Sequence, residues 1–451
     1  MSSSATAAQL NLTDHAILIL PFTSSLLQNP APLFPVIANA LSNAARQSFT
    51  ILFSAASPTQ LSGQSPGLDE KEGEKPLLYA TLRDEPISNF VLFQRFLCKV
   101  YTALVYAQMR AGRPLMDVEV HFDGEEGDYA GKLFRGNSNA GKGPDGDVHV
   151  QVILAEGVSI PSHLNSLLSN LPSYTVPIPF AYDADALTHT PTNSSDSSSS
   201  VQTPASNPTA SPYPVVALGG TFDHLHAAHK LLLHLALFLT TRKLIVGVMS
   251  DALLASKSDA GLVQKLPERL GEVQRFLLRL GGTYIGASSG DALPCYTEHG
   301  LSHGQGGLTP NHDLANTGRD SRSGTVAIGN KLDGRIEIAA AEITDALGPT
   351  RYDPDIQALV VSRETISGGK AVNATRREKG LGELELWVVD VIGLPPAGET
   401  NSDAELEEMR GMDGVEDEKI IKEMKMGSTG IRRWIAEHAH DPSVAQDDTE
   451  S

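Results

Sequence analysis

The chain has 451 residues, enough for about two or three domains, and its 54 Asp and Glu against 35 Lys and Arg give a net charge of −19. So acidic a surface repels polyanions, which disfavours general binding of DNA or RNA. Cys98 and Cys295 are too few for a disulfide framework, which favours a reducing compartment. Neither a secretory signal nor an Arg-rich transit peptide is recognisable, and apolar stretches such as Leu231–Leu239 fall short of the ~20 residues that cross a bilayer. We therefore expect a cytoplasmic protein without a membrane span, with the nucleus left open.

The first 187 residues have the composition of a globular module. His15–Leu20 and Phe49–Phe53 are predicted as buried strands, and Asn89–Met109 as a helix with one apolar face. Val118–Phe122 and Val148–Leu154 alternate as half-buried strands do. The pattern predicts an α/β or α+β module, and its residues indicate no function.

One loop of this module imitates a nucleotide-binding motif. Gly136–Lys142 spells most of a P-loop, but Gly143 and Pro144 follow the lysine where Ser or Thr and a helix are required. This context favours a solvent-exposed loop.

A segment rich in Ser, Thr, Pro and Asn, residues 188–213, separates the module from the rest of the chain. Its apolar residues are too sparse to offset the entropy of ordering, so it is predicted to be a disordered linker.

Residues 214–440 alternate between strands and helices. The predicted strands are Val215–Leu218, Leu244–Met249, Ile336–Ile343, Gln357–Ser362 and Leu384–Ile392, and the predicted helices are Ala227–Thr240, Pro267–Leu280 and Gly369–Lys379. Alternation with near-continuous apolar strands indicates an α/β domain with a Rossmann-like, doubly wound parallel sheet. Ligands of such sheets bind at the carboxyl ends of the strands.

Three polar stretches interrupt or follow this domain. A polar insertion is predicted at 287–324, an acidic flexible segment at 395–418, and a disordered tail at 441–451. The insertion contains His299, His303 and His312, for which solvated side chains are favoured over a metal site.

The chemistry concentrates in the first strand–turn–helix of this domain. Gly219 and Gly220 follow the strand and permit a sharp turn with close approach of a ligand, and Thr221 adds a hydroxyl. His226 and His229, three positions apart at the helix start, share one face beside N–H groups that favour anions. The spacing predicts a phosphate-binding turn with two histidines as N–H donors.

Four blocks then carry a resemblance to a known family. The segment GGTFDHLHAAH resembles the signature of the HxGH nucleotidyltransferases, with Ala228 in place of the usual glycine. The remaining blocks are Ser256-Lys257 with Pro267–Leu270, Val360–Thr365 with Gly368–Asn373, and Met426–Arg432. Together they resemble phosphopantetheine adenylyltransferase of the eukaryotic and archaeal type, including the corresponding domain of coenzyme A synthase. Gly427 departs from the last motif, whose first hydroxyl it removes.

The resemblance implies transfer of AMP from ATP to 4'-phosphopantetheine, with Mg²⁺ held through the ATP phosphates rather than by the protein. It implies catalytic roles for His229, Thr221 and Lys257, and ATP binding by Gly219, Gly220, Phe222, His226, Ser428, Thr429 and Arg432. It also implies substrate contacts for Thr221 and, with less support, for Lys370, Asn373 and Arg376. The partners so implied are the two substrates, together with a possible complex with other enzymes of coenzyme A synthesis.

Other functions stay open at this point. The same chemistry serves acceptors such as nicotinamide mononucleotide, a flavin or a phosphorylated alcohol. A class I aminoacyl-tRNA synthetase is disfavoured by the charge of −19 and by the lack of an anticodon-binding module. A non-catalytic scaffold for enzymes of coenzyme A synthesis is the third alternative.

Overall fold

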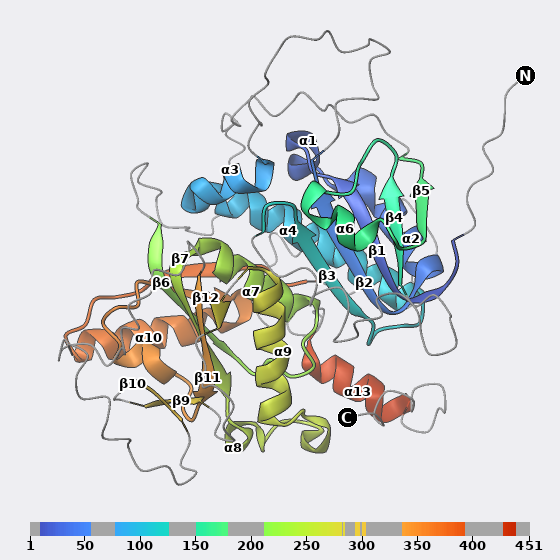
Figure 1. The fold of residues 1–451 in the computed structure, drawn as a ribbon. Helices are drawn as coiled ribbons and strands as arrows, with labels where there is room; N and C mark the ends of the chain where they lie inside the picture. Colours follow the sequence, from blue (N-terminus) through green and yellow to red (C-terminus); the bar gives the residue numbers. More distant parts are fainter. Residues whose placement is uncertain are drawn as a thin grey trace, which may run out of the picture. The chain divides into compact units, whose positions relative to one another are not determined.

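The computed structural model describes residues 10–55, 77–125, 150–178, 212–281, 283–284, 294–297, 300–303, 336–392 and 427–438 (Figure 1). Internal contacts divide the chain into two compact units. The N-terminal unit comprises residues 1–202, 226–231 and 390–426, and the C-terminal unit comprises residues 203–225, 232–389 and 427–451.

The N-terminal unit is built on a five-stranded parallel sheet in the order β3-β2-β1-β4-β5. Its strands are β1 (Thr13–Pro21), β2 (Ala45–Ser54), β3 (Asp117–Phe122), β4 (Val150–Ala155) and β5 (Ser173–Val176). Its helices are α1 (Ser24–Gln28), α2 (Phe34–Ala44), α3 (Leu78–Asp84), α4 (Pro86–Arg110) and α6 (Asn165–Leu168), with 3-10 turns at Ala31–Leu33 and Ser162–Leu164. The module is therefore α/β.

Two expectations for this unit are corrected. Strands β3 and β4 are buried almost throughout rather than half-buried, because side chains on both faces of a parallel sheet are covered by crossover helices. Helix α4 is a 25-residue helix, long and apolar enough to cross a membrane by length and composition. However, 72% of its most apolar window is buried, which is typical of a core helix.

Aromatic side chains fill the carboxyl end of this sheet. Phe22, Phe53 and Phe122 follow or end the first three strands, and their ring centroids lie 4.9 to 5.6 Å apart. Tyr79 stacks on Phe122 at 4.9 Å, and Phe93 of α4 lies 5.2 Å from the same ring. Offset and edge-on ring pairs add to the burial of apolar area, so Phe122 lies at the centre of the packing here.

We predict that Phe122→Ala lowers the free energy of unfolding of the N-terminal unit by about 3–5 kcal/mol, because it removes a fully buried ring and leaves a cavity. Hydrogen exchange of the amides of β2 and β3 measures the effect. The control is Val91→Ala on α4, whose side chain is 37% exposed, and which should change stability by no more than about 0.5 kcal/mol. Equal effects of the two variants would contradict the packing role.

The C-terminal unit confirms the predicted Rossmann-like α/β fold. Its sheet runs β10-β9-β11-β7-β6-β12-β13, and all five strands from β11 to β13 pair in parallel. The core strands are β6 (Tyr213–Gly220), β7 (Thr240–Met249), β11 (Glu337–Ile343), β12 (Ala358–Ser362) and β13 (Glu385–Val389), with β8 (Thr283–Tyr284) beside β11 and a hairpin of β9 (Pro294–Thr297) and β10 (Gly300–His303). The helices are α7 (Ala227–Leu239), α8 (Asp251–Leu254), α9 (Leu266–Arg279), α10 (Ile366–Glu378) and α13 (Ser428–His438), with 3-10 turns at Ala260–Leu262, Gly348–Arg351 and Arg363–Thr365. The first residues of α7, up to 231, are grouped by their contacts with the N-terminal unit.

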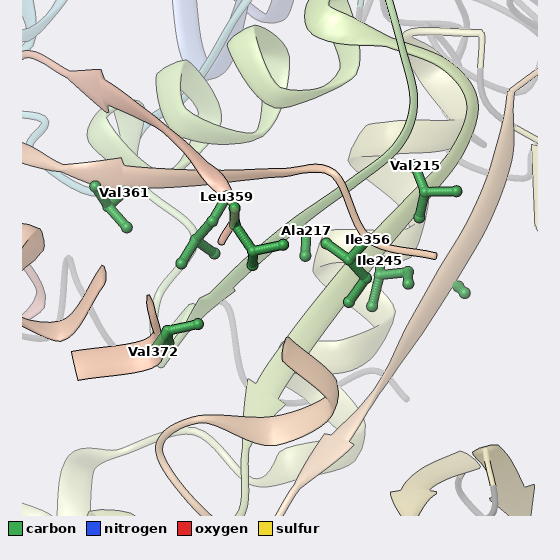
Figure 2. Packing of buried hydrophobic residues seen from close by; sticks show 9 residues of the cluster. Val215, Ala217, Ile245, Ile356, Leu359, Val361 and Val372 are labelled. Carbon is green, nitrogen blue, oxygen red and sulfur yellow. The ribbon is translucent and has the colours of Figure 1, made fainter. Parts of the chain in front are cut away.

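The buried core of this unit packs β6, the strand that precedes the predicted turn, against its neighbouring strands. Val215 and Ala217 of β6 pack with Ile245 of β7 and Leu359 of β12 (Figure 2). Val372 of α10 joins the same buried cluster. The carboxyl end of β6 is thereby fixed between two neighbouring strands.

Strand β6 runs through Gly219 and Gly220, so both glycines pair with β7 instead of forming the predicted loop. The turn begins at Thr221, two residues later than the sequence suggests, because a glycine at a strand end can continue the ladder as long as its backbone hydrogen bonds are available.

Several sequence-based expectations lie outside the described residues. They concern the P-loop-like segment Gly136–Lys142, the linker apart from residues 212–213, the acidic segment at 395–418 and the tail at 441–451. Of the predicted insertion at 287–324, the structure describes only β9 and β10.

Candidate nucleotide site

The turn after β6 holds two residues in a strained backbone conformation. Phe222 and His224 have φ angles of 49° and 46°, the left-handed region that side chains other than glycine seldom adopt. Phe222 is fully buried, and a Cβ added to Gly220 would lie 3.1 Å from its ring. Gly220 is thus required by the close approach of Phe222. Such strain persists only where surrounding contacts enforce it.

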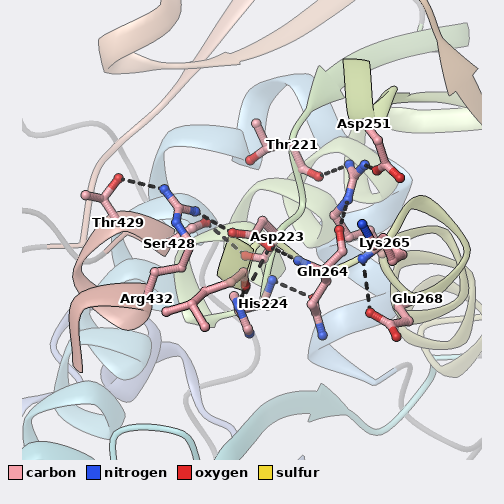
Figure 3. A network of polar contacts seen from close by, with 12 residues as sticks. Thr221, Asp223, His224, Asp251, Gln264, Lys265, Glu268, Ser428, Thr429 and Arg432 are labelled. Atoms are coloured by element: carbon pink, nitrogen blue, oxygen red, sulfur yellow. Dashed lines mark hydrogen bonds and ion pairs between the residues drawn. The ribbon is translucent and has the colours of Figure 1, made fainter. Parts of the chain in front are cut away.

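Asp223 supplies those contacts. Its side chain is 1% exposed, and its carboxylate accepts a hydrogen bond from the Gln264 main-chain N–H at 2.9 Å and pairs with Arg432 (Figure 3). The Gln264 side chain accepts from the His224 N–H at 2.7 Å. The Ser428 hydroxyl donates to the Asp223 carbonyl at 2.9 Å. The turn is held from both sides, by the segment before α9 and by the start of α13.

Arg269 of α9 holds the other end of the turn. Its guanidinium is fully buried and donates to the carbonyls of Thr221 at 2.8 Å and Met249 at 2.7 Å, and to the Asp251 carboxylate at 2.7 Å (Figure 3). Its Nε donates to the Gln264 carbonyl at 2.9 Å. These bonds join the ends of β6 and β7 to α9, and the main chain of Thr221 is fixed.

The structure brings Ser428, Thr429 and Arg432 to the turn through α13. The Arg432 Nε donates to the Ser258 carbonyl at 3.1 Å, and its Nη2 donates to the Thr429 hydroxyl at 3.3 Å. The guanidinium is 3% exposed. Binding of ATP phosphates by Arg432 stays a prediction, and the contacts within the chain give this arginine a positioning role.

His226 and His229 lie together at the start of α7. Their rings stack with centroids 3.9 Å apart and planes at 21°. The predicted common face is thus observed, at the helix end whose N–H groups favour anions.

The other predicted site residues are not joined to this network. Lys257 and Lys370 are exposed. Asn373 is buried, where its amide donates to the Leu384 carbonyl and accepts from the Leu384 N–H, both at 2.9 Å. The Arg376 guanidinium donates to three carbonyls, those of Thr350, Asp353 and Gly382. Substrate contacts by Asn373 and Arg376 stay predictions. These bonds show that both residues hold the loops that precede β12 and β13.

Sequence reasoning missed four side chains of the network, namely those of Asp223, Asp251, Gln264 and Arg269. Asp223 and Arg269 stand inside the motifs quoted above, so their positions were visible. Their partners were not, because the Asp223–Arg432 pair spans 209 positions.

Comparison with known proteins agrees with this geometry. Residues 217–281, which contain the turn and all of α9, match the family model described as cytidylyltransferase-like. This segment of the chain is therefore similar to a nucleotidyltransferase-type domain.

Two curated relatives are named phosphopantetheine adenylyltransferase. The one from Saccharomyces cerevisiae is 32% identical over 184 residues, which cover 41% of this chain and 43% of the relative. The one from Methanopyrus kandleri is 27% identical over 177 residues, which cover 39% of this chain and 78% of the relative. The match thus spans less than half of the yeast protein. A solved structure from Archaeoglobus fulgidus, titled as a protein with unknown function, is 24% identical and covers 42% of this chain and 95% of its own, but with a TM-score of 0.25 it carries no argument.

We predict that Arg432→Met destabilises the C-terminal unit by about 3–5 kcal/mol, because it leaves the Asp223 carboxylate buried without its counter-charge. Urea unfolding followed by tryptophan fluorescence reports this unit alone, since the chain's two tryptophans, Trp387 and Trp434, both belong to it. Combining Arg432→Met with Asp223→Asn should cost less than Arg432→Met by itself. Arg433→Met, at the exposed neighbouring position, is the matched control. Additive effects of the two substitutions would contradict a direct pair.

Proposed function

We propose that this chain is a pantetheine-phosphate adenylyltransferase, which transfers AMP from ATP to 4'-phosphopantetheine and gives dephospho-coenzyme A and pyrophosphate. The observation that carries the proposal is the immobilised turn from Thr221 to His224, which follows β6 and leads directly into α7 and its stacked histidines. The choice of acceptor is supported by the resemblance of Val360–Thr365 and Gly368–Asn373 and by the names of the relatives.

The proposed reaction requires positioning and charge stabilisation rather than a nucleophilic side chain. A phosphate oxygen of the acceptor attacks the α-phosphorus of ATP, the bond from that phosphorus to the β-phosphate oxygen breaks, and pyrophosphate leaves. Negative charge grows on the oxygens of the α-phosphate, where fixed N–H donors are most effective.

In this scheme each predicted residue has a part. His229 donates to the α-phosphate and His226 to the phosphates of ATP, while Thr221 holds the acceptor phosphate or α-phosphate oxygens. Lys257 adds positive charge from its exposed loop. Ser428 and Thr429 receive the β- and γ-phosphates at the start of α13, where N–H groups of the first turn face outward.

Mg²⁺ belongs to the proposal as a companion of ATP. Among the described residues, no cluster of three or more His, Cys, Asp or Glu side chains is arranged to hold a metal ion. Asp223, within the turn, is engaged by Arg432 and Gln264. We propose that the ATP phosphates coordinate the ion.

The cellular setting also belongs to the proposal. We propose a cytoplasmic location, which the low cysteine content favours, and a complex with other enzymes of coenzyme A synthesis through the N-terminal unit or the acidic segment at 395–418.

We predict that His229→Ala lowers kcat by about 10²- to 10³-fold with little change in KM, because the lost donor acts mainly on charge that develops in the transition state. Steady-state release of pyrophosphate from ATP and 4'-phosphopantetheine measures both constants. His15→Ala, on β1, is the matched histidine control. Near-full turnover by His229→Ala would remove this residue from the mechanism.

The acceptor is tested by incubating the full chain with ATP, Mg²⁺ and one of four compounds: 4'-phosphopantetheine, nicotinamide mononucleotide, riboflavin 5'-phosphate or phosphocholine. We expect pyrophosphate only with the first, together with a product of the mass of dephospho-coenzyme A. Activity with another acceptor would change the substrate and keep the chemistry. If ATP binds but no acceptor reacts, the scaffold alternative is favoured.

A further inference from the structure

The two units share one strand order. In the N-terminal unit the order is β3-β2-β1-β4-β5, and in the C-terminal unit the parallel strands run β11-β7-β6-β12-β13. Counted from the first strand of each unit, both orders are third, second, first, fourth, fifth. Because unrelated folds also use this order, it does not by itself show a repeated architecture.

The pairing of the first two strands is also the same in detail. Strand β1 skips one residue, Asp14, where β2 skips two, Arg46 and Gln47. Strand β6 skips Pro214 where β7 skips Thr241 and Arg242. In both units, therefore, one residue of the first strand lies opposite two of the second, directly after the first paired residues of the two strands. Bulges are specific features that tend to persist within a family.

The connections agree as well. Helix α2 ends at Ala44 and β2 begins at Ala45, and helix α7 ends at Leu239 and β7 begins at Thr240. The crossover helix therefore enters the second strand without a loop in each unit. With the bulges aligned, Phe22 takes the position of Phe222, and both rings are buried.

We infer that the N-terminal unit is a second copy of the nucleotidyltransferase fold in which side chains fill the nucleotide cradle. We use this name for the end of the first strand and the turn after it, residues 219–224 in the C-terminal unit. The chain therefore has one centre for nucleotide transfer and not two. This goes beyond the proposed function, which concerns the sheet that contains β6 and the start of α7.

The residues that replace the cradle cannot bind phosphate. Leu20 and Pro21 occupy the positions of Gly220 and Thr221, so a buried side chain and an imide nitrogen stand where the other unit has a glycine and a hydroxyl. The backbone is also relaxed here, since the Phe22 N–H continues the sheet by donating to the Ser54 carbonyl at 2.8 Å. The sequence has no histidine between His15 and His121, so α2 has no equivalent of the stacked pair.

Aromatic rings fill the space at the strand ends. By the same alignment, Phe53 and its partner Phe122 replace Val248 and Glu342. Phe53 and Phe122 stack at 5.3 Å, and Phe96 of α4 packs 5.1 Å from Phe53. A close-packed ring cluster leaves no room for a ligand without its disruption.

One of the polar groups at this end is a carboxylate. Asp123 follows β3 and lies 3.4 Å from the Ser54 hydroxyl and 3.6 Å from the His163 ring nitrogen. Its negative charge opposes binding of a nucleotide triphosphate.

Equilibrium dialysis of the full chain with radiolabelled ATP and Mg²⁺ tests the inference. Wild type should bind one ATP per chain. Gly220→Leu, which gives the C-terminal unit the residue of the N-terminal unit, should reduce this to none. Pro21→Thr, which restores the cradle's hydroxyl to the N-terminal unit, should leave the stoichiometry at one because the aromatic cluster still fills the space.

Photolabelling of wild type with 8-azido-ATP and peptide mapping gives a second measurement that does not depend on the folding of a variant. We expect no labelled peptide from residues 10–125. Two ATP per chain, one ATP retained by Gly220→Leu, or a labelled peptide from that range would overturn the inference. No binding by wild type would contradict the proposed function, yet it would agree with a closed N-terminal cradle, so the two failures are distinguishable.

Discussion

The ion pair between Asp223 and Arg432 is the contact on which the candidate site depends. It joins the turn after the first strand of the C-terminal unit to a helix 209 positions further along the chain. Buried charges are costly unless each finds a full set of partners. Here the carboxylate has Arg432 and the Gln264 N–H, and the guanidinium also reaches the Ser258 carbonyl and the Thr429 hydroxyl. The turn and the helix therefore stabilise one another, and neither is complete alone.

This mutual dependence explains how the strained turn persists. Left-handed backbone at a residue with a side chain costs on the order of 1–3 kcal/mol. Phe222 and His224 both have it, and they flank the aspartate that makes the strongest contacts. The Arg269 guanidinium fixes the Thr221 carbonyl, and the Gln264 side chain fixes the His224 N–H. Residues from two helices thus prepare the main chain before a ligand arrives, which is the condition for catalysis by positioning.

The sequence was sufficient to predict what depends on local periodicity. The five predicted strands, the three predicted helices, the parallel arrangement and the shared face of His226 and His229 are observed, although Gly219 and Gly220 belong to the strand and not to the turn. Partnerships across the chain were not predictable, because no spacing rule connects Asp223 to Arg432 or Arg376 to Gly382. Asn373 and Arg376 show the consequence. Their polar side chains on a helix fit a substrate contact as well as a structural bond, and only the fold reveals the backbone groups that they satisfy.

The two units show how little of this chemistry resides in the fold itself. Both have the same strand order and the same bulge, yet one ends its first strand in glycines and the other in Leu20 and Pro21. Function follows from those few residues at the strand ends.

Net charge then limits which groups can attract a nucleotide. A chain of charge −19 repels ATP at long range, so attraction must come from local groups. Two buried arginines near the turn contribute little, since Arg269 is paired with Asp251 and Arg432 with Asp223. The helix N-terminus with its histidines and the exposed Lys257 remain as local sources of positive potential. In the proposed function the exposed Lys257 therefore matters more for attracting phosphates than its surface position suggests, because the chain as a whole is acidic.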